Sequence, residues 1–540
     1  MKKTCLLLWA VMGTLPVWSQ NYVSKVWVAD KGNGTYQNPI IYADYSDPDV
    51  CRAGDDYYMV SSSFNCVPGL QILHSKDMVN WTIVGAALPD GLLYDQGFDK
   101  PQHGNGVWAP SIRYHQGEFY IYYGDPDFGV FMTKAQKAEG PWAPLTLVKA
   151  GKGLIDACPL WDEDGRAYVA HAFAGSRAGL KSVLAVFEMT PDGTRAIGES
   201  RIVFDGHEKH ETVEGAKFHK RDGYYYILAP AGGVKPGWQL AMRSKNVYGP
   251  YEERIVLAQG KTAINGPHQG AWVQTQTGED WFFHFQDVYA YGRIVHLQPM
   301  KWVDGWPVMG IDKDGDGTGE PVLTYKKPNV GGTYPVCTPQ ESDEFDGLTL
   351  GAQWQWHANP QSTWAFYAGH KGYARLFSVP VPKGYKNLWD VPNLLLQKFP
   401  APEFSATAKL TFTPNPKMVG ERAGLVAMGM DYAGLFIENT GKGLVLSQTE
   451  CLKADKGAAE KINASQPLTD GNVWLRVKVV KGGVCSYSYS TDGKKFTDLG
   501  ASFTAREGRW IGAKVGVFIT RPEWSNDGGW LDVDWFRIDR

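Results

Sequence analysis

Cysteine is scarce in this chain and the net charge is close to zero, and each scarcity excludes a class of protein. Only 7 of the 540 residues are cysteines, and six of them follow residue 19. That is too few for a disulfide framework, so we expect buried free thiols, with a Cys51–Cys66 bridge as the alternative. The formal net charge is −3 and no basic run occurs. A nucleic acid is therefore not an expected partner, because binding one requires a cationic face.

Long apolar runs are missing too. The longest, from about Cys5 to Val17, is too short to span a bilayer, and no other segment approaches its length. Lys2-Lys3 precede this run and Ser19 closes it, which predicts an export signal over residues 1–19. We therefore expect a periplasmic or extracellular protein without a membrane span. The composition gives no indication of the oligomeric state.

Glycine and aromatic residues are abundant, and they recur in a fixed template. Five times, at spacings of roughly 50 to 60 residues, a strand leads through a Gly/acidic turn into a strand crowded with aromatics. The turn glycines are Gly54, Gly117, Gly165, Gly223 and Gly278. Repeats of this length, built from paired strands, predict an all-β fold in the form of a five-bladed β-propeller with one repeat per blade.

A residue suited to chemistry stands seven to ten positions before each turn glycine. These five residues are Asp47, Trp108, Asp156, Glu214 and His268. The first strand of every propeller blade lines the central axis, so five equivalent positions should converge there. Three carboxylates, a tryptophan and a histidine at one place describe a hydrolytic site for a sugar. Taken singly, the carboxylates have structural alternatives as turn or cap residues, and Asp44 and Asp49 compete with Asp47.

The texture of the sequence changes after the fifth repeat. Residues 20–325 form the predicted propeller, and the Pro/Gly-rich segment 326–340 reads as a linker. Residues 341–540 carry longer alternating strands, which predict a second all-β domain with two packed sheets.

Several motifs together resemble glycoside hydrolase family 43. They are Asn38-Pro39-Ile40, Asp47-Pro48-Asp49-Val50, Ser61-Ser62-Ser63-Phe64, Val107-Trp108-Ala109-Pro110, Val213-Glu214-Gly215 and Gly266-Pro267-His268-Gln269-Gly270. The C-terminal half resembles the concanavalin-like sandwich, or jelly roll, of β-xylosidase-type members of that family. The resemblance implies an exo-acting, inverting glycosidase that releases α-L-arabinofuranose, β-D-xylose or both from plant hemicellulose or its oligosaccharides. A non-catalytic carbohydrate-binding propeller and an endo-acting arabinanase or xylanase-like hydrolase are the alternatives.

The resemblance also implies a role for each site residue. Asp47 would be the general base and Glu214 the general acid, while Asp156 would orient Glu214 and raise its pKa by like-charge repulsion. Phe64 and Trp108 would stack on the sugar, with core packing as the alternative. His268 and Arg293 would form the floor of the pocket, although His268 could instead hold an axial metal.

No cofactor is expected to be required, but a structural calcium is left open at two places. Asp312-Lys313-Asp314-Gly315-Asp316-Gly317 matches the first half of an EF-hand loop, yet Leu323 occupies its twelfth position, so we interpret it as an acidic turn. The alternative is a site in the second domain, built from Asp343, Glu344, Asp532 and Asp534.

One loop of the second domain is expected to reach the pocket mouth. The segment 519–529 contains Trp524 between two predicted strands. The alternative is an ordinary surface turn. The short linker favours two docked domains over a freely moving module.

Overall fold

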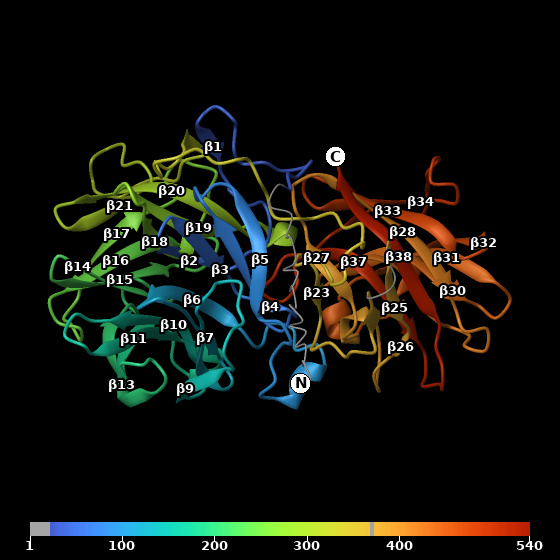
Figure 1. Ribbon diagram of the computed structural model, residues 1–540, viewed down its shortest axis with the longest axis horizontal. Helices are drawn as coiled ribbons and strands as arrows, with labels where there is room; N and C mark the ends of the chain where they lie inside the picture. Colours follow the sequence, from blue (N-terminus) through green and yellow to red (C-terminus); the bar gives the residue numbers. More distant parts are fainter. Residues whose placement is uncertain (1–21, 368–371) are drawn as a thin grey trace, which may run out of the picture.

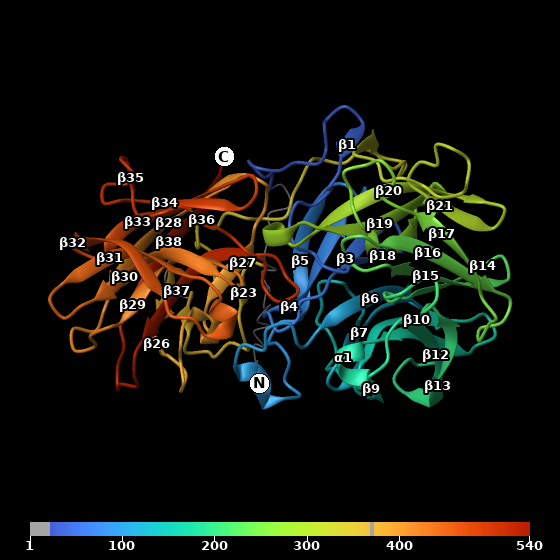
Figure 2. The ribbon, with the colours of Figure 1, turned by 180° about the vertical axis from the view of Figure 1, so that it is seen from behind.

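The computed structural model describes residues 22–367 and 372–540, so the predicted export signal lies outside the described residues. Two β-rich domains lie side by side, the N-terminal one in blue to yellow and the C-terminal one in orange to red (Figure 1). The view from behind shows the same division (Figure 2). No helix in the described part of the chain is long and apolar enough to cross a membrane.

The first domain is the predicted five-bladed propeller. Each blade is an antiparallel sheet of four consecutive strands. Blades 1 and 2 comprise β2 (Asp49–Ala53), β3 (Asp56–Val60), β4 (Gly69–Ser75), β5 (Trp81–Leu88), β6 (Trp108–His115), β7 (Glu118–Asp125), β8 (Gly129–Ala135) and β9 (Thr146–Ala150). Blade 3 comprises β10 (Leu154–Trp161), β11 (Ala167–Phe173), β12 (Val183–Met189) and β13 (Ala196–Asp205). Blades 4 and 5 comprise β14 (Lys217–Arg221), β15 (Tyr224–Ala231), β16 (Trp238–Ser244), β17 (Glu252–Leu257), β18 (His268–Gln274), β19 (Asp280–Asp287), β20 (Arg293–Val303) and β21 (Trp306–Met309).

The turn glycines lie where the template places them, between the first and second strand of each blade. Their φ angles run from +62° at Gly54 to +91° at Gly278. A Cβ on any of the five would meet nothing within 4 Å, so the left-handed backbone, and not a lack of space, requires glycine there.

The aromatic second strands fill the gaps between the blades. Side chains of a strand alternate between its two faces, so each second strand serves two neighbouring gaps. Tyr123 packs in the cluster between blades 1 and 2, whereas Tyr122 packs in the cluster between blades 2 and 3. The first strands lie nearest the axis, where β2 contacts β6 and β18, and β10 contacts β6 and β14.

Segments from the two ends of the propeller close the ring. The strand β1 (Thr35–Gln37) pairs antiparallel with β22 (Thr324–Lys326). The amide of Asn38 donates to the carbonyls of Leu297 and Val322, both at 2.8 Å, and its oxygen accepts from the Leu297 amide. The chain before blade 1 is thereby fixed to blade 5.

The second domain is the predicted sandwich of two large sheets. One contains β23 (Gln355–Trp356), β26 (Val379–Pro380), β27 (Leu395–Lys398), β29 (Arg422–Met428), β30 (Tyr432–Asn439), β31 (Leu444–Cys451), β32 (Lys461–Leu468) and β37 (Lys514–Arg521). The other contains β24 (Ala365–Phe366), β25 (Ala374–Phe377), β28 (Phe404–Thr413), β33 (Asn472–Val480), β34 (Val484–Ser490), β35 (Thr497–Asp498), β36 (Phe503–Thr504) and β38 (Trp530–Asp539). Their inner faces share one apolar core that includes Phe412, Leu425, Val477 and Phe536.

Buried polar contacts join the two domains. Val67 and Trp356 form a β-bridge across the junction. Lys514 is 3% exposed, and its ammonium group donates to Cys66 Sγ at 3.1 Å and to Gln355 Oε1 at 2.9 Å. Cys66 is therefore not bridged to Cys51, and all six cysteines of the described residues are free.

Candidate active site

The five residues picked out by the template meet at the propeller axis. Asp47, Trp108, Asp156, Glu214 and His268 line one cavity of about 120 Å³, together with Arg293. Four of them stand at or just before the first residue of the first strand of their blade, and Asp156 stands near the beginning of that strand. Residues up to 246 positions apart are thus brought together by the ring, as Asp47 and Arg293 show.

The five positions are not strictly equivalent, which corrects the expectation from the sequence. One residue near the start of each first strand has left-handed backbone. These residues are Asp47 (φ 55°), Ala109 (36°), Asp156 (60°), Gly215 (67°) and Gln269 (37°). Asp47 and Asp156 occupy that position themselves, whereas Trp108, Glu214 and His268 come one residue earlier. Both members of the pairs Trp108–Ala109 and His268–Gln269 line the cavity, because the left-handed residue turns the chain sharply.

Asp47 is held by three donors and is nearly enclosed, with 7% of its side chain exposed. Its Oδ2 accepts from Ser46 Oγ at 2.9 Å and from Ser62 Oγ at 2.5 Å. Arg293 Nη1 donates to Asp47 Oδ1 at 3.1 Å and to Ser46 Oγ at 2.8 Å. Ser62 also accepts from the Ala109 amide, at 2.7 Å, which ties the carboxylate to blade 2. The orientation of Asp47 is therefore fixed from both sides.

Asp156 lies deeper than Glu214. Its Oδ2 accepts from the Gly215 amide at 2.7 Å and its Oδ1 from Gln269 Nε2 at 3.3 Å. Burial, together with the charges of Glu214 and Asp47, raises the pKa of Asp156 to about 7. The like-charge crowding that the sequence suggested is therefore present at Asp156.

Glu214 has its partner in His268. The two are joined by a 3.1 Å contact between Oε1 and Nε2, and 29% of the Glu214 side chain is exposed toward the cavity. His268 is 1% exposed, and its Nδ1 has no hydrogen-bond partner among the described residues. The described residues gather no set of three His, Cys, Asp or Glu ligand atoms around His268. His268 positions the carboxyl group of Glu214.

One aromatic side chain lines the cavity from the propeller. Trp108 is anchored by its indole N–H, which donates to the Gly104 carbonyl at 2.8 Å. Phe64, expected beside it, is 3% exposed and meets Trp108 edge-on with the ring centroids 6.3 Å apart. Phe64 supports Trp108 from behind and is not among the residues that line the cavity.

The two competitors for the base lie outside the cavity. Asp49 is buried behind the site, where it accepts from Arg113 Nη1 and the Ile112 amide, both at 2.7 Å. Asp44 accepts from the backbone amides of Arg293, at 2.8 Å, and Gly512. Burial raises the pKa of Asp44. Asp44 therefore joins the site arginine to a loop of the second domain.

That loop, residues 506–512, closes one side of the cavity with Trp510. The prediction for residues 519–529 was wrong: Trp524 is 73% exposed and does not line the cavity. Trp510 meets Trp108 at 6.1 Å between ring centroids and lies 6.0 Å from the guanidinium carbon of Arg293. The only signal for this loop in the sequence is an Arg-Trp pair between Gly508 and Gly512.

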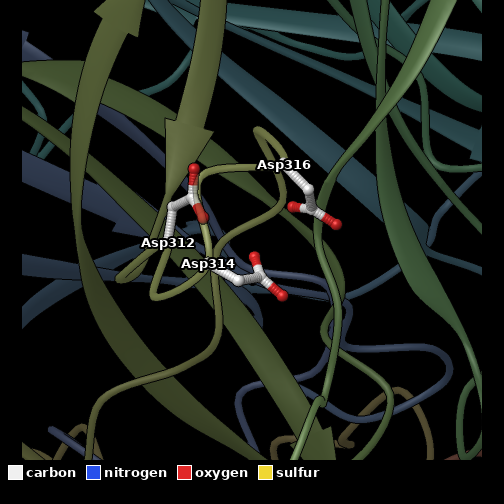
Figure 3. A group of neighbouring side chains, drawn as sticks. All are labelled: Asp312, Asp314 and Asp316. Atoms are coloured by element: carbon white, nitrogen blue, oxygen red, sulfur yellow. The ribbon is translucent and has the colours of Figure 1, made fainter.

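The four carboxylates proposed for a calcium site in the sandwich are not brought together. Each has its own partner: Trp354 for Asp343, Arg537 for Glu344, Arg375 for Asp532 and Lys409 for Asp534. In the described residues, the one group of three such side chains whose ligand atoms lie close enough together to hold a metal ion is Asp312, Asp314 and Asp316, on the surface loop after β21 (Figure 3). The Asp312 carboxylate accepts from the amides of Gly315 and Gly317, as an acidic turn requires.

Comparisons with known proteins support the assignment of both domains. Residues 36–307 match Glycosyl hydrolases family 43, and residues 342–539 match the β-xylosidase C-terminal concanavalin A-like domain. A β-xylosidase of Formosa agariphila is 33% identical over 94% of this chain and 91% of its own. A non-reducing end α-L-arabinofuranosidase of Bacteroides ovatus is 28% identical over 99% of each chain. The crystal structure of a family 43 protein of Bacillus licheniformis superposes with a TM-score of 0.79 at 28% identity, covering 94% of this chain and 99% of that one.

Proposed function

The chain belongs to glycosyl hydrolase family 43, and on that premise we propose that it is an exo-acting, inverting glycosidase. Its substrates are plant hemicelluloses or their oligosaccharides, from which it releases terminal β-D-xylose, α-L-arabinofuranose or both. The observation that carries this proposal is the convergence of Asp47, Asp156 and Glu214 on one small cavity. Asp47 has Arg293 as a cationic partner, whereas Asp156 is buried with only the Gly215 amide and the Gln269 side chain as donors. Gathering three carboxyl groups in one small cavity is therefore costly, and a purely structural role does not account for it.

Each carboxyl group has one task in the proposed reaction. Glu214, held by His268, gives its proton to the glycosidic oxygen as the bond to the anomeric carbon breaks. Asp47, held by Ser62 and Arg293, takes a proton from a water that attacks the opposite face of that carbon. The product sugar therefore carries the inverted anomeric configuration.

We propose that Asp156 keeps one proton shared between its own carboxyl group and that of Glu214. Its pKa of about 7 lets it hold a proton when Glu214 is ionised. When Glu214 is protonated, the Asp156 carboxylate can accept the hydrogen bonds from Gly215 and Gln269 that fix its position. Like charges this close disfavour ionisation of both groups, so the pair retains a proton for the leaving group.

The shape of the cavity supports exo action. Trp510 roofs a small space whose walls come from all five blades. Such a cavity takes the terminal sugar of a chain or branch, whereas an endo-acting enzyme needs an open groove along the propeller face.

The direct test uses paired substrates and the product's configuration. Purified protein should hydrolyse nitrophenyl β-D-xyloside, nitrophenyl α-L-arabinofuranoside or both, and proton NMR of the first product should show the inverted anomer. No turnover of either substrate would contradict the enzyme assignment. A retained anomer would contradict the role of Asp47.

Export is a separate part of the proposal. Lys2-Lys3 and the apolar run that ends near Val17 support a signal that is removed after Ser19. The N-terminal sequence of the secreted protein should begin at Gln20, and an intact Met1 on the exported form would contradict this.

A further inference from the structure

A cysteine and a lysine from different domains are in direct contact at the buried junction between the domains. Cys66 belongs to the propeller segment between β3 and β4, and Lys514 is the first residue of β37 in the sandwich. The two residues are 4% and 3% exposed, and Lys514 Nζ lies 3.1 Å from Cys66 Sγ. That spacing is too long for a direct sulfur–nitrogen bond, and it is short enough for one oxygen atom to bridge the two.

The surrounding structure holds both atoms in place. Val67, the residue after Cys66, forms the β-bridge with Trp356 that joins the domains. Lys514 lies in a strand that is paired with β27 on one side and with β29 on the other. Gln355 Oε1 accepts from Lys514 Nζ at 2.9 Å and so fixes the direction of the lysine side chain. The contact between sulfur and nitrogen is therefore built into the junction.

The same junction holds a second buried ammonium group, that of Lys398. Lys514 donates to a thiol and an amide, those of Cys66 and Gln355. Lys398 donates to the side-chain amide of Gln71. Burial and the charge of Lys514 lower the pKa of Lys398 to about 7. A nitrogen bonded to oxygen is only weakly basic and is neutral near pH 7, so a cross-link through Lys514 removes one of the two buried charges.

We propose that Cys66 and Lys514 are a modification site, at which dioxygen joins them into a covalent sulfur–oxygen–nitrogen cross-link between the two domains. In the net reaction one oxygen atom of dioxygen becomes bonded to both Sγ and Nζ. The other oxygen atom leaves as water with the thiol hydrogen and one hydrogen of the amine, and the extra proton of the ammonium group passes to solvent. The thiol and the amine together give up the four electrons that reduce dioxygen. Dioxygen is small and apolar, which suits it to enter a buried junction.

The cross-link would hold the roof of the catalytic cavity against its wall. Lys514 follows the 506–512 loop, which carries Trp510, by two residues. Cys66 follows by two residues Phe64, whose ring supports the aromatic wall of the cavity. The covalent bond therefore joins the segments of the two domains that meet at the site.

Cys158 provides an internal control, because it has a similar setting and a different nitrogen partner. It is buried, and its Sγ accepts from Arg113 Nη2 at 2.8 Å. A guanidinium group does not lose its proton in proteins, so its nitrogens have no free electron pair with which to bond oxygen. Cys158 should therefore stay a free thiol where Cys66 reacts.

The test is a tryptic peptide map of the full chain. Protein held in air-saturated buffer is compared with protein kept under argon with dithiothreitol. Trypsin releases Cys66 in peptide 53–76 and cuts after an unmodified Lys514. In the air sample, trypsin should fail to cut after Lys514, and peptide 53–76 should be joined to the peptide that begins at residue 510. The joined mass should show a gain of one oxygen and a loss of two hydrogens, and the thiols titrated after unfolding should fall by one per molecule.

Two variants separate the cross-link from other oxidation of cysteine. Lys514→Arg keeps the buried cation and removes the amine, so Cys66 should keep its thiol in air. Cys66→Ser removes the sulfur, so the thiol count should be the same in air and under argon. In the wild type, an unmodified Cys66, a sulfinic acid on Cys66 without the joined peptide, or a disulfide, which consumes two thiols, would each overturn the inference. Equal modification of Cys158, or the same loss of the Cys66 thiol in Lys514→Arg, would also overturn it.

Discussion

Replacing Asp156 by asparagine should make the protein more stable at neutral and alkaline pH while it harms catalysis. An unfolded aspartate loses its proton near pH 3.8, whereas burial and the neighbouring charges keep Asp156 protonated up to about pH 7. Between these values the folded state holds one proton more than the unfolded state. The free energy of unfolding of the wild type therefore falls as the pH rises, by about 1.4 kcal/mol per pH unit for this group. The asparagine does not titrate, so the variant escapes this loss.

The expected signature is a difference that grows with pH. Unfolding free energies from urea titrations, followed by tryptophan fluorescence, should favour Asp156→Asn increasingly from pH 4.5 to 7. The gain should level off above pH 7, at about 2–4 kcal/mol. Turnover of xyloside or arabinofuranoside should fall at least tenfold, because the asparagine cannot share a proton with Glu214 and cannot accept hydrogen bonds from Gly215 and Gln269 with two oxygens. A difference that stays flat over the whole range would refute the reasoning.

Asp162 supplies the matched control, since it is a second carboxylate of blade 3 with the opposite environment. Burial alone would raise its pKa, but hydrogen bonds from Lys220 and Tyr225 lower it below the usual value. The stability that it contributes is fully present above pH 3.8 and is lost only as the pH falls through the lowered pKa. Asp162→Asn should therefore be destabilised by an amount that does not change between pH 4.5 and 8.5.

Three further predictions concern the site and its roof. Asp47→Ala and Glu214→Ala should each lower kcat on an oligosaccharide by about 10²–10⁴-fold with unchanged circular dichroism. Glu214→Ala should retain more activity on the nitrophenyl glycoside, because its leaving group needs little protonation. A kcat near that of the wild type on the oligosaccharide would contradict the proposed roles. Asp44→Asn, which weakens the link between the Arg293 backbone and the 506–512 loop, should raise KM for oligosaccharides more than for the nitrophenyl glycoside, and equal KM changes on both would contradict a positioning role. A chain ending at Gln340 should be poorly soluble and inactive, because it exposes the surface that Trp356 and Lys514 cover; a soluble propeller with wild-type kinetics on nitrophenyl glycosides would show that the sandwich is dispensable.

The sequence alone was sufficient to predict those features of the fold that repeat along the chain. The spacing of the turn glycines predicted the blade count, because a left-handed turn residue recurs once per blade. The same periodicity located Asp47, Asp156 and Glu214. It could not resolve the one-residue offset between Asp156 and Glu214, which arises from local backbone conformation at the start of each strand. No periodicity indicates which loop of the second domain meets the propeller, so Trp510 was missed in favour of the equally plausible Trp524.

The four carboxylates considered for a calcium site in the sandwich are not brought together, for a related reason. Asp343 and Asp532 lie near the two ends of the sandwich sequence, and the ends of a sandwich domain meet in space. Meeting in space is not enough, because each carboxylate finds a nearer partner, Trp354 for Asp343 and Arg375 for Asp532. Side-chain pairing at this level depends on register, which the alternation of strands does not specify.

The division of the site over five blades and a second domain makes catalytic competence a late event in the life of the chain. A ribosome that has released Asp47 must add 246 more residues before Arg293 can pair with it. Trp510 emerges later still, 29 residues before the last strand ends at Asp539. A fragment from interrupted translation or proteolysis therefore lacks at least one of the residues that line the cavity. We therefore expect glycosidase activity to be absent from any fragment that ends before Trp510.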